Sequence, residues 1–155
     1  MEQPHPRQDA LALPVLPCAC ASLRRAARAV TQLYDKELRP AGLNGPQFTL
    51  LQVLASAGPL TQGRLGDLLA LDTTTLSRTL RPLVARRWIR SRPGKDRRER
   101  HFELSRAGRT ELLRATPFWE RAQARLRARI GGEEWAGLLA QLSRVTGAVR
   151  HALGA

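Results

Sequence analysis

The sequence has no run of about 20 apolar residues, which is the length that a membrane-spanning helix needs. Its apolar stretch over 10–23 is interrupted by Pro14 and Pro17 and follows acidic residues, so we predict no secretory signal. Two cysteines, Cys18 and Cys20, are too few for a disulfide framework in a chain of 155 residues. The expected location is therefore the cytoplasm.

Motifs of catalysis and metal binding are also missing. The three histidines are scattered, and there is no Cys-x-x-Cys, His-x-x-x-His or glycine-rich phosphate loop. Glu133 and Glu134 begin a predicted helix and do not resemble a catalytic carboxylate pair. The pair Cys18 and Cys20 lacks the further ligands that a metal site needs. We therefore expect no enzyme activity, no metal and no cofactor.

Acidic residues are scarce compared with basic ones. The chain has 13 Asp and Glu against 26 Lys and Arg, so its formal net charge is +13. Lysine is nearly absent, and a compositional bias toward arginine explains the choice of Arg but not the twofold excess over acids. A soluble domain with such an excess typically binds a polyanion, and nucleic acid is the first expectation.

Apolar residues at helical spacing occur along most of the chain. Residues 1–17 carry four prolines and little periodicity, so we predict a flexible arm there. The predicted helices cover 21–39, 44–58, 61–69, 73–87, 105–130 and the residues after 132. Pro117 is expected to kink the fifth helix. The third and fourth helices are separated by a very short link, which is typical of a helix-turn-helix.

After the fourth helix the pattern changes to alternating apolar and polar residues, over 88–92 and 101–104. The intervening segment 93–99 contains Pro, Gly and charged residues, which favours a β-hairpin with a basic tip. We therefore predict a mainly α fold with a small β-hairpin wing, in which 44–109 form a winged helix-turn-helix.

The two ends of the chain are predicted to form a dimerisation region. The last helix has apolar residues at alternating spacings of three and four, which is typical of a helix that pairs with another. These residues are Trp135, Leu138, Leu142, Val145 and Val149. We expect 18–155 to be a single domain, with dimerisation helices over 18–42 and 110–155.

Two stretches resemble the MarR family of bacterial regulators. The run from Leu71 to Leu83, LDTTTLSRTLRPL, is similar to that family's recognition helix. Residues 96–98, Asp-Arg-Arg, followed by LSRAGR over 104–109, are similar to its wing and to the start of its long helix. Trp88 departs from the family, which usually has a small residue there. The resemblance covers about 18–153 and implies a homodimeric transcription regulator, most often a repressor, that binds double-stranded DNA.

The predicted recognition helix has a polar face opposite its inward leucines. Hydroxyl side chains near its start would bond phosphates or base edges, and the arginines reach further. The predicted DNA contacts are Thr73, Thr74, Ser77, Arg78 and Arg81 of the helix, with Lys95, Arg97 and Arg98 of the wing tip. The resemblance favours Arg98 for the minor groove, oriented by Asp96. A dimer would place two such helices about 34 Å apart on a roughly palindromic operator.

A thiol is one candidate sensor of a regulatory signal. Cys18 and Cys20 lie at the start of the first helix, where the helix dipole and nearby arginines favour a thiolate. In the peroxide-sensing subgroup of the family, the reactive cysteine and a tyrosine correspond to Cys20 and Tyr34. A second tyrosine of that subgroup corresponds to Gly45 here. The alternative is that Cys20 is a small buried residue and Cys18 is inert.

A small aromatic or anionic ligand is the other candidate signal, because similar regulators bind one between the dimerisation helices and the DNA-binding lobe. Phe48, Phe118 and Trp119, together with Tyr34, are candidates for lining such a pocket, and core packing explains these aromatics equally well. A protein that coats nucleic acid without reading sequence is the other class that accounts for the charge. Competition by bulk genomic DNA distinguishes that class from a regulator.

Overall fold

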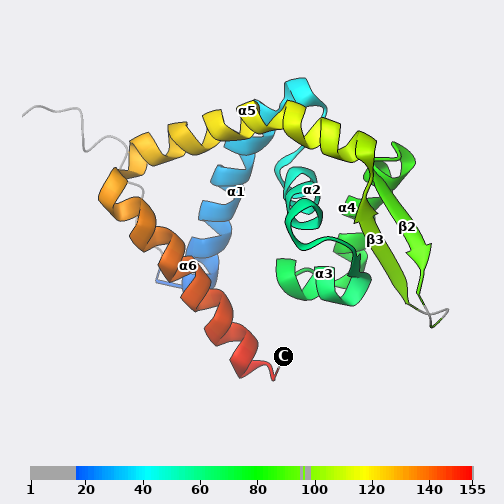
Figure 1. The fold of residues 1–155 in the computed structure, drawn as a ribbon. Coiled ribbons are helices and arrows are strands. Elements are labelled where there is room, and N and C mark those ends of the chain that lie inside the picture. Colours follow the sequence, from blue (N-terminus) through cyan, green and yellow to red (C-terminus); the bar gives the residue numbers. More distant parts are fainter. Residues whose placement is uncertain (1–16, 95, 97–98, 155) are drawn as a thin grey trace, which may run out of the picture.

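The computed structural model describes residues 17–94, 96 and 99–154, so the predicted arm lies almost wholly outside the described residues. Figure 1 shows a helical molecule with a small sheet at one end, as predicted. The helices are α1 (Ala19–Leu38), α2 (Gly45–Ala57), α3 (Gln62–Leu69), α4 (Thr73–Ala85), α5 (Arg106–Ile130) and α6 (Gly132–Ala152), with a 3₁₀ turn over Arg39–Ala41. The strands are β1 (Leu60–Thr61), β2 (Ile89–Pro93) and β3 (Arg100–Leu104).

The sheet has three antiparallel strands in the order β1-β3-β2, so a further strand joins the hairpin that the sequence predicted. β2 and β3 pair along their whole length. β1 pairs Leu60 with Phe102 and Thr61 with His101. This strand escaped prediction because two residues are too short to show alternation, and Thr61 also serves as the N-cap of α3.

The core lies where α2, α3 and α4 meet the sheet and α5. Each fully buried leucine contributes about 1.5–3 kcal/mol relative to an exposed one, so this cluster fixes how α3 and α4 cross. The largest fully buried side chains are Leu38, Phe48, Leu50, Leu51, Leu54, Leu65, Leu76, Leu83 and Ile89.

Side-chain caps define where the helices of this lobe begin. Asn44 and Gln47 form a capping box, in which the Asn44 side chain accepts from Gln47 N at 3.0 Å and the Gln47 side chain accepts from Asn44 N at 3.2 Å. Ser105 caps α5 by accepting from Gly108 N at 2.9 Å. These caps satisfy backbone donors that a helix leaves free at its start, and they explain why the sequence located these ends.

The long helices α1 and α5 pack side by side through polar contacts as well as apolar ones. The Tyr34 hydroxyl donates to Gln123 Oε1 at 2.6 Å, and burial raises the pKa of this tyrosine. Glu37 forms ion pairs with Arg125 and Arg121. The hydrogen bond from Arg125 is the main reason why the pKa of Glu37 lies below its usual value. α1 is thereby held against α5 by the hydrogen bond of Tyr34 and by the ion pairs of Glu37.

α5 runs through Pro117 as one helix, so the predicted kink does not interrupt it (Figure 1). Gly131, with a φ of 109°, separates α5 from α6, and α6 then runs back past α3. No residue of α6 is buried. Three residues of the predicted seam, Leu142, Val145 and Val149, are 40–53% exposed in the single chain, whereas Trp135 and Leu138 are half-buried.

Candidate nucleic-acid interface

α4 has one buried face and one exposed polar face. Leu76, Leu80 and Leu83 are at most 3% exposed, as the sequence predicted. The opposite face carries the five residues expected to contact DNA, and all of them are exposed: Thr73, Thr74, Ser77, Arg78 and Arg81. Their contact with DNA stays a prediction. The face is free of bulky apolar side chains, so it fits the major groove, which admits one helix.

The start of α4 is held by a single carboxylate. Asp72 Oδ1 accepts from Thr75 N at 2.9 Å, and its Oδ2 accepts from the Thr75 hydroxyl at 2.6 Å. The bond from the Thr75 side chain is the main reason why the pKa of Asp72 is lowered, and the bond from the Thr75 backbone adds to it. Because the capping group is turned to Thr75, the hydroxyls of Thr73 and Thr74 remain on the exposed surface.

The turn between α3 and α4 is very tight. Ala70 ends α3 in the left-handed region, with φ 51°, and Leu71 N bonds to Gly66 O at 2.9 Å. The Gln62 side chain of α3 then donates to Ser77 Oγ of α4 at 2.9 Å. The sequence does not reveal this second link, because nothing in the spacing of Gln62 and Ser77 marks them as neighbours. Together the two links fix α4 relative to α3.

The end of α4 leads directly into the wing. Trp88 N bonds to Leu83 O at 3.0 Å and Arg87 N to Val84 O at 2.9 Å, which is the hydrogen-bond pattern of a Schellman motif. Arg87 therefore has a φ of 59°, where glycine is the usual residue. Trp88 follows, half-buried, with the Arg86 guanidinium 4.8 Å from its ring centroid. The departure at Trp88 thus leaves the entry into β2 intact.

The predicted wing-tip residues Lys95, Arg97 and Arg98 lie outside the described residues. Asp96, which was expected to orient Arg98, is exposed, and Glu99 N bonds to its carbonyl oxygen at 2.9 Å, in a turn between the strands. The orienting role of Asp96 therefore stays a prediction.

The wing strands carry basic residues that sequence analysis did not select. Arg90 and Arg92 of β2 share one acid, Glu103 of β3, at 3.7 and 2.8 Å. Arg100 of β3 is exposed beside the tip. The available signal was the local charge excess, because residues 61–109 hold 13 Lys and Arg against 5 Asp and Glu, and 13 − 5 gives +8. That excess alone does not distinguish which arginines lie together.

The candidate redox residues lie on α1 and near its start. Cys18 and Cys20 are both free and exposed in the single chain, so Cys20 is not the buried core residue of the alternative interpretation. Tyr34 lies 14 positions beyond Cys20, about 21 Å along a helix, and its hydroxyl is bonded to Gln123. Within one chain, Tyr34 and Cys20 therefore do not meet.

The four candidate pocket residues, Tyr34 among them, are not brought together around one cavity. Phe48 is 1% exposed and stacks on Trp119 with ring centroids 5.7 Å apart, so it packs in the core, and its place in a pocket wall stays a prediction. Phe118 is half-buried under the Arg121 guanidinium, which lies 4.5 Å from its ring centroid. Trp119 does line a cavity, at the corner between α5 and α6.

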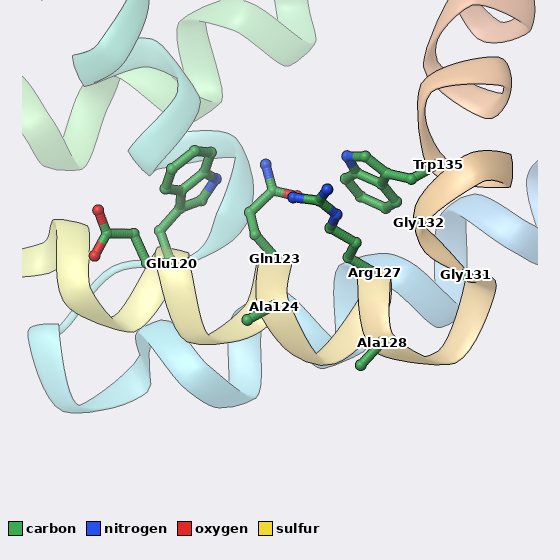
Figure 2. Close-up of a pocket in the computed structure, with 9 residues that line it drawn as sticks. Glu120, Gln123, Ala124, Arg127, Ala128, Gly131, Gly132 and Trp135 are labelled. Atoms are coloured by element: carbon green, nitrogen blue, oxygen red, sulfur yellow. The ribbon is translucent and has the colours of Figure 1, made fainter.

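A cavity of about 650 Å³ lies in the corner between α5 and α6. Figure 2 shows Gln123 and Arg127 projecting from α5 on the side that faces Trp135 of α6. Trp119 and Gln123, two of its lining residues, connect it to the rest of the molecule through Phe48 of α2 and Tyr34 of α1. This cavity combines two indoles, a guanidinium and the carboxylate of Glu120. Arg127 was not selected from the sequence, and Trp135 was selected only for the dimerisation seam.

Two general features bound what the chain can do. The part of the chain that the structure describes contains no group of three or more His, Cys, Asp or Glu side chains placed to bind a metal ion. Among the same residues, no helix combines the length and the apolar content needed to cross a bilayer.

Comparisons with known proteins match this architecture to transcription regulators. Residues 41–99 match the family model described as the MarR family. The M. tuberculosis transcriptional regulator MosR, solved in complex with DNA, is 33% identical with a TM-score of 0.78, over 87% of this chain and 98% of that chain.

Two further proteins are similar to this chain. The HTH-type transcriptional regulator YwoH of Bacillus subtilis is 30% identical over 84 residues, which are 54% of this chain and 61% of that protein. A mutant of MarR from E. coli complexed with operator DNA has 22% identity and a TM-score of 0.72, over 81% of this chain and 91% of that chain, and shares the fold. These similarities are to regulators rather than to enzymes.

Proposed function

Because the chain belongs to the MarR family of transcription regulators, we propose that it binds double-stranded DNA with sequence specificity. We propose further that it acts as a homodimeric repressor on a roughly palindromic operator and that a small-molecule signal releases it. The observation that carries this proposal is the exposed polar face of α4, which lies beside a strongly basic sheet. A helix of this kind fits the major groove, and the wing reaches the adjacent minor groove.

Selection of bound fragments from genomic DNA, followed by competition, tests the specificity. We expect a preferred fragment that stays bound when bulk genomic DNA is added in large excess. Its affinity should fall steeply with salt, with a slope of about −0.9 per neutralised phosphate. A protein that only coats nucleic acid would lose every fragment to the competitor at the same concentration, and this outcome would reject the proposal.

Dimer formation is supported by α6. Its apolar residues Leu142, Val145 and Val149 lie at spacings of three and four and are 40–53% exposed, which is the pattern of a helix that packs against a partner helix. We expect Leu142→Glu to convert a dimer to a monomer in sedimentation equilibrium. Leu68→Glu is the matched control, because Leu68 of α3 is 50% exposed and lies outside the predicted dimerisation helices, so it should leave the dimer intact. A monomeric wild type would contradict this part of the proposal.

Release by a ligand is supported by the cavity between α5 and α6. Indole rings stack with planar ligands and a guanidinium pairs with a carboxylate, so an aromatic acid suits the combination of Trp119, Arg127 and Trp135. We expect benzoate or a larger aromatic acid to release the selected DNA fragment from the wild type but not from the Arg127→Gln variant. If the aromatic acid released the fragment from both proteins at the same ligand concentration, the ligand would not bind through Arg127.

Thiol sensing is a second candidate function, and the exposure of Cys20 favours it. An exposed thiol is accessible to a hydroperoxide, which oxidises a thiolate to a sulfenic acid. We expect a stoichiometric organic hydroperoxide to release DNA from the wild type and to leave Cys20→Ser bound. Continued binding by the oxidised wild type would end this candidate without affecting DNA recognition.

A further inference from the structure

A second cavity, of about 390 Å³, lies between α4 and the sheet, and we call it the α4–sheet cavity. It is lined from α3, α4, β2 and β3, and its polar lining residues are Gln62, Ser77, Arg81, Ser91 and Arg100. Phe102 contributes part of the apolar wall. The cavity therefore has donors on several sides and no acidic side chain among the residues that line it.

Two of these donors are arginines without a partner. Neither Arg81 nor Arg100 forms an ion pair with any residue that the structure describes, and both are exposed. The acids near Arg100 are Asp96 and Glu99, which line a neighbouring cavity together with Arg100 and Gln62 and do not line the α4–sheet cavity. Glu99 is bonded to His101 at 3.2 Å. The positive charge of the α4–sheet cavity is thus not neutralised from within its own lining.

The hydroxyl groups of the cavity are also able to donate. Ser77 Oγ accepts from Gln62 Nε2, so its own hydrogen is not used in that bond. Ser91 Oγ is buried and has no hydrogen-bond partner among the described residues. A buried hydroxyl without a partner is unfavourable, and an acceptor bound in the cavity would supply the missing partner. The lining as a whole is suited to an anion that accepts several hydrogen bonds.

The place of the cavity identifies the anion. If α4 lies in the major groove and the wing enters the adjacent minor groove, one sugar-phosphate strand separates these two grooves. That strand would pass across the junction of α4 and the sheet, and the α4–sheet cavity lies at this junction. Figure 1 shows β2 and β3 running alongside the lobe that contains α4.

We propose that the α4–sheet cavity binds one backbone phosphate of the DNA in each half-site, held between Arg81 and Arg100. This inference rests on the proposed function and extends it. It assigns Arg81 to the DNA backbone, whereas Arg78 remains the arginine of α4 that reads base edges. Arg100 is a backbone contact that the sequence did not reveal. Such contacts position a protein on the duplex without reading its sequence.

Salt-dependent binding of three variants tests the assignment. Arg81→Gln and Arg100→Gln should each weaken binding to the selected fragment and to random duplex by the same factor, about tenfold. Each should also reduce the steepness of the salt dependence by about 0.9, the value for one phosphate. Arg129→Gln, which removes the same charge from the end of α5, is the matched control and should leave the affinity nearly unchanged. All three arginines are exposed, so these variants keep the core.

The contacted phosphate is located by replacing single backbone phosphates of the fragment, one position at a time, with a neutral methylphosphonate. At one position per half-site it should weaken wild-type binding about tenfold and have no further effect on Arg100→Gln, because the two changes remove the same interaction. Additive effects at every position would overturn the proposal. Loss of binding to the selected fragment alone would also overturn it, since it would make these arginines base readers. A wild type that binds no duplex would reject the proposed function and this inference together.

A free anion is the other possible source of phosphate. At constant ionic strength, inorganic phosphate at about 10 mM should not displace the fragment from the wild type more than from Arg100→Gln. Displacement of the wild type alone would show that the cavity takes free phosphate in competition with DNA, and this result would contradict the assignment to the backbone.

Discussion

Gly108 lies at the junction where α4, the wing and α5 meet. A Cβ atom at this position would overlap the Trp88 carbonyl oxygen and lie 2.7 Å from Leu104 Cδ1. Next to it, Ser105 Oγ donates to Arg87 O at 2.7 Å and accepts from Gly108 N at 2.9 Å. The junction is therefore packed backbone against backbone, and this explains why a glycine stands one turn into α5.

We predict that Gly108→Ala lowers the free energy of unfolding by about 3 kcal/mol, because the added methyl group forces the strand and helix apart. Urea denaturation followed by circular dichroism measures this change. Gly63→Ala is the control, because a Cβ at Gly63 meets no atom within 4 Å and alanine favours a helix. Equal stability of the two variants would show that the junction is looser than the structure indicates.

Asp72 makes the stability of α4 depend on pH. Its hydrogen bonds to Thr75 lower its pKa in the folded chain below the ordinary value of 3.8. A carboxyl group whose pKa is lower in the folded state stabilises that state above its unfolded pKa, and the contribution is lost as pH falls through the folded pKa. The charge also favours the positive end of the helix dipole.

We predict that the wild type melts a few degrees above Asp72→Asn at pH 7 and that this difference shrinks as pH falls from 5 to 3. Asparagine still offers an oxygen to Thr75 N but does not titrate, so the other carboxyl groups affect both proteins alike and cancel. The measurement is the melting temperature of each protein across that range. A difference that stays constant with pH would mean that Asp72 does not act through its charge.

α6 contacts the helix-turn-helix and stabilises it through Arg150. Arg150 Nη1 of α6 donates to Asp67 O of α3 at 2.7 Å, and its Nη2 lies 3.9 Å from Asp67 Oδ1. The same carbonyl oxygen accepts from Ala70 N at 3.4 Å in the tight turn. A guanidinium at the end of a helix stabilises its free carbonyl groups. The helix proposed for dimerisation thus contacts the turn that sets the position of α4.

We predict that Arg150→Ala weakens operator binding by up to about fivefold, since exposed ion pairs contribute at most about 1 kcal/mol. The salt dependence of binding should be unchanged, because this arginine positions α3 and does not contact phosphate. Arg144→Ala removes the same charge from α6 and serves as the control. A shallower salt dependence for Arg150→Ala would identify Arg150 as a phosphate contact and contradict its role in positioning α3.

The sequence was sufficient to predict the helices and the hairpin, because periodicity and caps are local. The helices that were expected to begin at 44, 61, 73 and 105 are capped by Asn44, Thr61, Asp72 and Ser105. Local patterns do not reveal the strand β1, which exists only through pairing with β3. They also do not reveal the left-handed conformation of Arg87, which the surrounding packing imposes on a residue that does not favour it.

For the candidate interface, too, the sequence predicts features within one helix but not contacts between elements. The polar face of α4 follows from the spacing of its leucines, whereas contacts between elements depend on how the elements cross. Gln62 and Ser77 are 15 positions apart, and Arg150 lies 83 positions from Asp67. The aromatic residues show the same limit, because spacing alone did not separate the core residue Phe48 from Trp119, which lines a cavity.

At the scale of the whole molecule, charge is distributed unevenly in a way that fits the proposed function. Residues 61–109 account for +8 of the net charge of +13, and they include α4 and the wing. A concentrated positive field accelerates association with DNA and makes affinity sensitive to salt. α6 lies at the other side of the molecule from β2 and β3 (Figure 1), so a dimer formed through α6 would leave both wings free.

The proposed function depends on the exposed face of α4 reading DNA bases. The most direct measurement is the affinity of Arg78→Ala and Arg129→Ala for the selected operator and for operators with single base changes. We predict that Arg78→Ala binds the operator about tenfold more weakly and no longer discriminates at one base position per half-site, while Arg129→Ala matches the wild type. If Arg78→Ala retains both affinity and discrimination, α4 does not lie in the major groove.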